Sequence, residues 1–88
     1  MSRIEEKIKI KNSLGLHARP AAQFVKKALE FNSQILIKKD DQILDAKSIM
    51  NILSLGLERN SEVSLIVEGL DAQQAIKELK KILESEDE

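Results

Sequence analysis

Cysteine, tryptophan and tyrosine are absent from this sequence, and phenylalanine occurs only twice, at Phe24 and Phe31. Without cysteine, the chain can form no disulfide, no cysteine-ligated zinc site and no thiol nucleophile. The scarcity of aromatic side chains removes the surfaces on which nucleic-acid bases stack, and a net charge of −1 shows no basic excess. We therefore expect no binding of nucleic acid.

Long apolar segments are also missing. No run reaches the ~18 apolar residues of a transmembrane helix, and the segment MSRIEEKIKIK lacks the apolar core of a signal peptide. Together with the absence of cysteine, this predicts a cytoplasmic protein without membrane insertion. A chain of 88 residues can bury one hydrophobic core, so we expect a single domain over residues 1–88.

Hydrophobic periodicity predicts seven elements in the order βαββαβα. The predicted strands are EKIKIK (6–11), two arms of a hairpin over 34–46 that turns at Asp40–Asp41, and EVSLIVEG (62–69). The predicted helices cover about 17–30, a short segment from Ser48 to Gly56, and a segment that starts after Asp71. One-sided apolar faces indicate an α+β fold with helices on one face of a sheet and solvent on the other.

The sequence also predicts how the two long helices are placed. In the first, the residues expected to face the sheet are Ala21, Val25, Ala28 and Leu29. In the last, Asp71 followed three residues later by Gln74 matches a capping box. The apolar face of that helix consists of Ala72, Ala75, Ile76, Leu79, Ile82 and Leu83.

The segment LGLHARPAA (14–22) gathers unusual residues at the predicted start of the first helix. A lone histidine there can be a plain cap, but the neighbours of His17 favour a site. Gly15 permits a sharp turn, Pro20 suits the first helical turn, and Arg19 offers a planar cation. A helix N-terminus attracts anions, and a neutral imidazole has the lone pair of a nucleophile. The pattern fits a histidine that accepts and donates a phosphoryl group, although it does not by itself select phosphate over another anion.

Two motifs resemble a known family. LGLHARPAAQFV (14–25) is similar to the active-site segment of HPr, the histidine-containing phosphocarrier of the bacterial phosphoenolpyruvate-dependent sugar phosphotransferase system. KSIM followed by LSLGL resembles the second HPr signature, and the resemblance covers essentially the whole chain. It implies an open-faced β-sandwich, in which a four-stranded antiparallel sheet has three helices on one face.

The resemblance also implies a function. His17 receives a phosphoryl group on Nδ1 from phosphorylated enzyme I and passes it to IIA domains of sugar permeases, while Arg19 contacts that group. Such a protein is a relay rather than an enzyme, and we expect a monomer that uses no cofactor and no metal. The sugars served depend on the partners.

Ser48 has two interpretations, and both stay open. As an N-cap, its hydroxyl stabilises the short helix that follows. In firmicute-type HPr proteins the matching serine is phosphorylated by an HPr kinase/phosphorylase, which would add charge that repels enzyme I and bring in a transcriptional regulator as a partner. Enteric-type relatives have the serine without that regulation.

The resemblance further implies a docking patch for the partner proteins. Counting helical faces from Ser48 predicts that Ile52 points inward, whereas Met50 and Leu53 point outward. Asn51 departs from the glycine of many firmicute-type relatives and adds a polar group to the patch. The positions that match the family's patch are Gln23, Phe24, Lys26, Lys27, Ile49, Met50 and Leu53.

Alternatives to a sugar-system carrier remain. One is a carrier of a nitrogen-related branch, or a regulatory paralogue, although the regulatory HPr-like protein of bacilli lacks the active-site histidine that is present here as His17. Another is an interaction module in which His17 only caps a helix. A third is a small α+β enzyme, which the absence of an acid–base pair near His17 disfavours.

Overall fold

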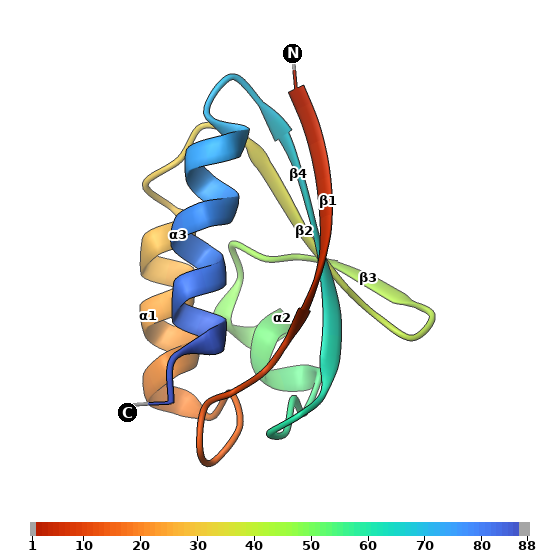
Figure 1. The fold of residues 1–88 in the computed structure, drawn as a ribbon, viewed down its shortest axis with the longest axis vertical. Coiled ribbons are helices and arrows are strands. Elements are labelled where there is room, and N and C mark those ends of the chain that lie inside the picture. Colours follow the sequence, from red (N-terminus) through yellow and green to blue (C-terminus); the bar gives the residue numbers. More distant parts are fainter. Residues whose placement is uncertain (1, 87–88) are drawn as a thin grey trace.

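A computed structural model of the protein describes residues 2–86, and its elements follow the predicted order βαββαβα. The strands are β1 (Ser2–Lys9), β2 (Gln34–Lys39), β3 (Gln42–Asp45) and β4 (Glu62–Gly69). The helices are α1 (Ala18–Ala28), α2 (Ile49–Ser54) and α3 (Ala72–Glu84). Figure 1 shows the three helices on one side of the sheet, which confirms the predicted two layers and the open-faced sandwich. Within residues 2–86, no helix is long and apolar enough to cross a membrane.

The sheet is antiparallel throughout, with the strand order β1-β4-β2-β3. β1 pairs with β4 from Ser2 opposite Gly69 to Lys9 opposite Glu62. The strand therefore begins earlier than the predicted EKIKIK, because β4 supplies partners along the whole length of this edge. The predicted turn at Asp40–Asp41 is confirmed, since Lys39 pairs with Gln42 and Asp40 takes a positive φ of 54°.

The core lies between the sheet and the helices. Alternate strand residues point into it, as predicted, and six of them are at most 2% exposed: Ile8, Ile35, Ile37, Val63, Leu65 and Val67. Ile10, just after the end of β1, is fully buried as well. The long helices close the core with five residues of α3 (Ala72, Ala75, Ile76, Leu79, Leu83) and four apolar residues of α1 (Ala21, Phe24, Val25, Ala28). Ile82, predicted to lie on the same face of α3, is partly buried against this core.

Leu29 was predicted to face the sheet, and this is wrong. α1 ends at Ala28, and Leu29 is its C-cap residue with 62% of its surface exposed. The inward stripe of α1 is filled instead by Phe24, which lies one turn before Ala28 and is fully buried. Ala21, Phe24, Val25 and Ala28 form the buried stripe at spacings of three and four, and Leu29 lies at the edge of that stripe, one residue beyond the end of the helix.

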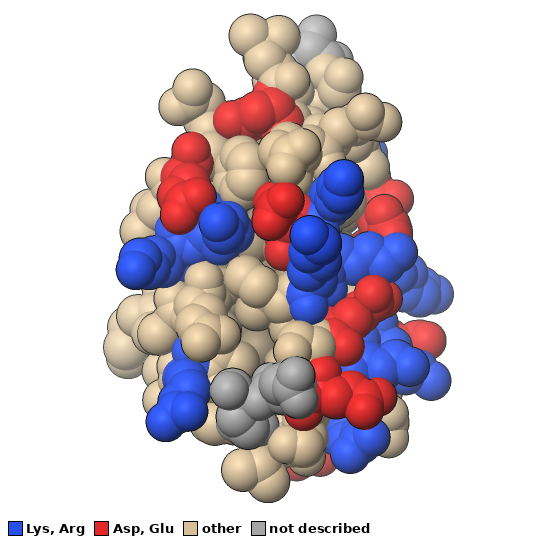
Figure 2. All heavy atoms as spheres, turned by 60° about the vertical axis from the view of Figure 1, so that its left-hand side comes forward, with Lys and Arg blue, Asp and Glu red and all other residues tan. Residues whose placement is uncertain are grey.

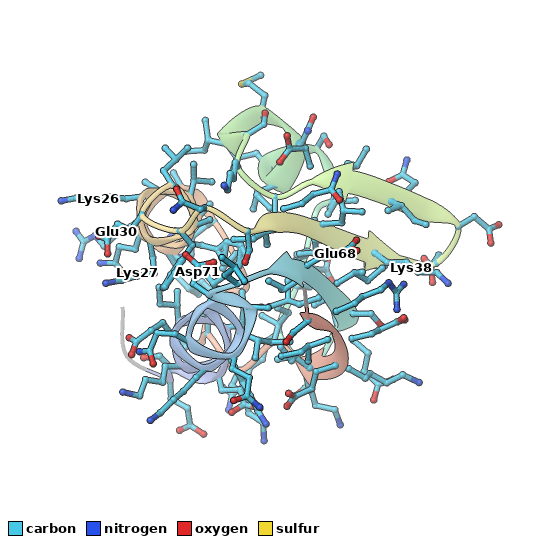
Figure 3. All side chains as sticks on the ribbon, turned by 90° about the horizontal axis from the view of Figure 1, so that it is seen from above. Lys26, Lys27, Glu30, Lys38, Glu68 and Asp71 are labelled. Atoms are coloured by element: carbon cyan, nitrogen blue, oxygen red, sulfur yellow. The ribbon has the colours of Figure 1, made fainter. Side chains whose placement is uncertain are left out.

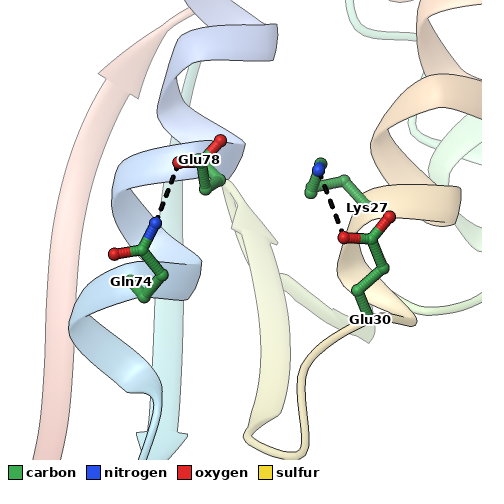
Figure 4. Close-up of polar contacts among 4 residues, drawn as sticks. All are labelled: Lys27, Glu30, Gln74 and Glu78. Carbon is green, nitrogen blue, oxygen red and sulfur yellow. Dashed lines mark hydrogen bonds and ion pairs between the residues drawn. The ribbon is translucent and has the colours of Figure 1, made fainter.

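The capping box predicted at the start of α3 is also absent. Asp71 is the N-cap residue, but its side chain does not cap the helix. Its carboxylate accepts hydrogen bonds from the N–H groups of Asn32 (2.9 Å) and Ser33 (3.0 Å) and from the Ser33 hydroxyl. Gln74 does not reach back to the cap, because its amide donates to Glu78 Oε2 at 2.9 Å (Figure 4). The carboxylate thus binds the loop before β2 instead of the first N–H groups of α3. These hydrogen bonds connect the start of α3 to the loop that follows α1.

Candidate functional site

His17 lies where the β1–α1 loop enters α1. It is the N-cap residue, with extended backbone (φ −84°, ψ −167°), and its carbonyl accepts a hydrogen bond from Ala21 N–H at 2.9 Å. Its imidazole makes no capping hydrogen bond to the helix, and the ring is half-buried. The interpretation of His17 as a plain side-chain cap therefore does not hold.

The first turn of α1 is suited to an anion. The N–H groups there have no acceptor within the helix, and they carry its partial positive charge. Arg19 is exposed in that turn, Pro20 is buried, and the turn contains no acidic residue. A negatively charged group held by His17 would meet these N–H groups and a cation whose planar fork matches phosphate oxygens.

Gly15 fixes the approach to His17 by close packing. Its φ is +76°, and a Cβ at this position would lie 2.6 Å from the Leu57 carbonyl oxygen and 2.8 Å from Glu58 Cα. The next residue, Leu16, donates its N–H to the same Leu57 carbonyl at 2.8 Å. The two sequence motifs are therefore joined in space, since the loop that follows α2 supports the loop that carries His17.

Ser48 is the N-cap residue of α2, as predicted. The Ser48 hydroxyl accepts a hydrogen bond from Asn51 N–H at 3.3 Å, which satisfies one of the free N–H groups of this six-residue helix. Ile52 is fully buried, whereas Met50 is 72% and Leu53 40% exposed, so the predicted faces of α2 are confirmed. The Asn51 amide does not simply face solvent, because it donates to the Asp45 carbonyl at 3.1 Å and ties α2 to the end of β3.

The residues expected in the docking patch lie on α1 and α2, which are in contact with each other. Gln23 and Lys26 are exposed, as are Ile49, Met50 and Leu53. Lys26 and Lys27 project away from the sheet (Figure 3). Lys27 is half-buried and pairs with Glu30 at 3.2 Å (Figure 4).

Phe24 does not belong to this patch, which corrects the expectation drawn from the family pattern. Its side chain is 0% exposed because it fills the inward stripe of α1. Gln23 and Lys26, on either side of Phe24 in the sequence, are exposed, because neighbouring residues of a helix point in different directions.

Charged groups of both signs are interspersed over the side of the molecule that carries the helices (Figure 2). Among residues 2–86, no group of three or more histidine, aspartate or glutamate side chains is placed to hold a metal ion. The groups available at the N-terminus of α1 are the His17 imidazole, the Arg19 guanidinium and the backbone N–H groups of the first turn.

Similarity to known proteins extends along nearly the whole chain. A family model described as the PTS HPr component phosphorylation site matches residues 4–85. The HPr-like protein Crh of Halalkalibacterium halodurans is 43% identical over 83 residues, which cover 94% of this chain and 99% of that protein. Phosphocarrier protein HPr of Buchnera aphidicola subsp. Acyrthosiphon pisum is 43% identical over 79 residues, which cover 90% of this chain and 93% of that protein.

Solved structures agree with these relatives. The crystal structure of HPr-C-His from Thermoanaerobacter tengcongensis has a TM-score of 0.88 at 51% identity and covers 93% of this chain and 92% of its own. A second structure from that organism is described as an HPr dimer, with a TM-score of 0.73 at 52% identity and 88% of each chain covered.

Proposed function

The chain belongs to the HPr family of phosphocarriers, and we propose from this membership that it serves the phosphoenolpyruvate-dependent sugar phosphotransferase system. In that role it accepts a phosphoryl group from phosphorylated enzyme I on His17 and gives it to IIA domains of sugar permeases. The observation that carries the proposal is the position of His17, which is the N-cap residue of α1 and is followed by Arg19 in a first turn that contains no acidic residue.

The transfer itself is an exchange of one P–N bond for another. The lone pair on Nδ1 of His17 attacks the phosphorus of the donor's phosphohistidine, the new P–N bond forms, and the donor imidazole leaves with the electrons of the old bond. The phosphoryl group then carries its charge beside the first-turn N–H groups of α1 and the Arg19 guanidinium, which favour an anion there. In the second transfer a nucleophile of the next partner attacks the phosphorus, and the His17 imidazole leaves with the electrons of the P–N bond. The protein therefore turns over only between two other proteins.

Partner docking is proposed for the exposed residues near this site. Ile49, Met50 and Leu53 present apolar surface on α2, and Gln23, Lys26 and Lys27 offer polar contacts on α1. Exposed apolar side chains beside a polar rim are typical of protein contact surfaces, and methionine adapts to several partners. A single patch could therefore receive enzyme I and several IIA domains in turn.

Regulation at Ser48 is a further part of the proposal. A protein kinase would transfer the γ-phosphoryl group of ATP to Oγ, placing about two negative charges next to the docking residues of α2. The cap position tolerates such a group electrostatically. Mass spectrometry of the protein isolated from its own cells decides this: phosphoserine at Ser48 supports regulation, and its absence under all growth conditions leaves Ser48 a structural cap.

A regulatory role without phosphoryl relay is the second candidate, because the chain is similar to HPr-like protein Crh. The presence of His17 favours the carrier, since the family's regulatory protein in bacilli lacks that residue. We expect the protein to be a monomer, whereas a similar chain is described as an HPr dimer. Sedimentation of the protein measures which of the two states it adopts.

Replacement of His17 tests the carrier role. With enzyme I, magnesium and phosphoenolpyruvate, we expect the wild-type protein to gain one acid-labile phosphoryl group and His17→Ala to gain none, as followed by intact-mass spectrometry at neutral and acidic pH. Lys77→Ala, at an exposed position of α3, is the control and should be labelled like the wild type. Labelling that persists in His17→Ala would remove His17 from the proposed role.

A further inference from the structure

Asn12 is a buried polar residue in the loop that leads to His17. Only 1% of its surface is exposed, although it lies between β1 and α1 in a segment without regular structure. Its side-chain amide donates one hydrogen bond to the Ile82 carbonyl at 3.1 Å and another to the Ser85 carbonyl at 2.9 Å. Both acceptors lie at the C-terminal end of α3, about seventy residues along the chain.

These contacts close the C-terminus of α3 from outside the helix. The last turn of a helix leaves carbonyl groups without an intrahelical donor. The neighbouring Lys11 donates its backbone N–H to the Leu83 carbonyl at 2.9 Å, so the loop donates to three carbonyl groups of this region, those of Ile82, Leu83 and Ser85. The loop before the site and the end of α3 therefore form one hydrogen-bonded unit.

The main chain of Asn12 holds the site at the same time. Its carbonyl accepts the Gly15 N–H at 2.9 Å and closes a four-residue turn, Asn12–Gly15. Leu16 is then fixed by its bond to the Leu57 carbonyl, and His17 follows directly. A path of hydrogen bonds and backbone connections thus runs from the end of α3, through the Asn12 amide and the turn, to the backbone of His17.

The Asn12 amide is oriented by its two donor bonds alone. Its Oδ1 is buried and has no hydrogen-bond partner within the described part of the chain, which lowers stability relative to a fully satisfied amide. A helix C-terminus can be closed by glycine or by water without a buried, unsatisfied acceptor. Asparagine at this position is therefore better explained by the fixed geometry that it imposes on the loop.

We propose that Asn12 is a positioning residue for phosphoryl transfer: it anchors the Asn12–Gly15 turn to the C-terminal end of α3 and so sets the place of His17. The inference rests on the proposed carrier function. Asn12 does not meet the phosphoryl group, and it lies outside the docking patch. Its loss should therefore alter the transfer step and leave the encounter with enzyme I unchanged, because small misplacements of a reacting group lower rates steeply.

Three variants test this proposal. Asn12→Ala removes both donor bonds, and Asn12→Asp keeps the shape but sets a carboxylate against two carbonyl groups. Ser33→Ala is the matched control, since Ser33 is also a buried polar residue (2% exposed) and its hydroxyl bonds to Asp71 at the opposite end of the molecule. All three should lower the melting temperature, so stability alone does not separate them.

The decisive measurement is the rate of phosphoryl acceptance from phosphorylated enzyme I, well below the melting temperatures. We expect kcat to fall about ten-fold in Asn12→Ala and further in Asn12→Asp, with KM within two-fold of the wild type and Ser33→Ala unchanged. Equal kcat in Asn12→Ala and wild type would overturn the proposal, as would a parallel fall of kcat in Ser33→Ala.

Amide hydrogen exchange separates this inference from the carrier proposal. In Asn12→Ala the N–H groups of Gly15 and Leu16 should exchange at least ten-fold faster, and in Ser33→Ala they should not. Unchanged exchange would show that Asn12 does not hold the turn. If the wild-type protein accepts no phosphoryl group at all, the carrier proposal and the role of Asn12 in transfer both fail, while the exchange rates still decide whether Asn12 fixes the turn.

Discussion

Two glycines near the site show how much the surroundings of a residue matter. Gly15 and Gly56 both adopt positive φ, at 76° and 57°. Gly15 presses against the backbone of Leu57 and Glu58, whereas a Cβ on Gly56 would meet nothing within 4 Å. Both positions require a positive φ, which favours glycine. Only at Gly15 would a side chain also collide with neighbouring backbone.

Alanine at each glycine separates these demands. Gly56→Ala should lower the free energy of unfolding by about 1 kcal/mol, the usual cost of a left-handed conformation with a side chain. Gly15→Ala should cost at least about 3 kcal/mol, because the loop must also move away from the Leu57 carbonyl. Urea denaturation of both variants measures the difference, and equal losses would contradict the packing described at Gly15.

The Gly15 variant also bears on function. Displacement of the loop moves His17 relative to Arg19 and the first turn of α1. We expect slower phosphoryl acceptance in Gly15→Ala than in Gly56→Ala at a temperature where both are folded.

At the scale of elements, the junction between the start of α3 and the loop before β2 is made through the Asp71 carboxylate. The hydrogen bond from the Ser33 hydroxyl and that from the Asn32 N–H hold the pKa of Asp71 below its ordinary value of 3.8. The folded state thus binds this proton more weakly than the unfolded state. The resulting stabilisation is present above the unfolded-state pKa and disappears as the pH falls below 3.8 and through the lowered folded-state value.

Asp71→Asn tests that junction. The variant should have a lower free energy of unfolding than the wild type at neutral pH. The difference between the two free energies should become smaller as the pH falls below about 4. Urea denaturation at a series of pH values between 7 and 2 measures this difference. Asp41→Asn, in the exposed β2–β3 turn, serves as the control for the loss of one negative charge. A difference that stays constant with pH would show that Asp71 contributes only through its shape.

The sequence predicted those elements whose signals are local. Alternation placed Ile8, Ile35 and Val63 in the core, and Ser48 identified the start of α2, because each pattern is complete within a few residues. The prediction of a capping box was wrong because the Asp71 carboxylate binds the loop at Asn32–Ser33. That loop lies 38 or 39 residues away in the sequence, so no local pattern reveals it.

The candidate site shows the same limit. His17 and Arg19 stood out through their immediate neighbours, but the support of Gly15 by Leu57 and of Asn12 by α3 depends on tertiary contacts. Phe24 was assigned to the surface by a family pattern, although the i, i+3, i+4 spacing of Ala21, Phe24 and Val25 could have identified it as buried.

At the scale of the whole molecule, the two faces differ in what they present. The helix side carries His17 and the exposed residues of α2, whereas the open face of the sheet is formed by the outward residues of four strands. Ile43 is an exposed apolar residue on that open face (52%), opposite the outward-facing Lys38. Both faces therefore have apolar side chains, but only one of them borders the candidate site.

Charge substitutions on each face test which one receives enzyme I. Met50→Lys should raise KM for phosphoryl acceptance about ten-fold, a loss of about 1.4 kcal/mol of binding, since it puts a charge into an apolar contact. Ile43→Lys should leave KM within two-fold, and both variants should fold because the original side chains are exposed. Matching KM values for the two variants would place the docking surface elsewhere.

The chain enters and leaves the fold at opposite ends of the molecule, with Ser2 far from the β1–α1 loop and the end of α3 close to it (Figure 1). Because Asn12 donates to the Ser85 carbonyl, we expect a fluorescent protein fused after the C-terminal end to lie close to the loop that carries His17. A fusion ahead of Ser2 would leave that loop and the helix side clear. The fold thus indicates where a reporter can be attached for imaging or capture without disturbing the histidine.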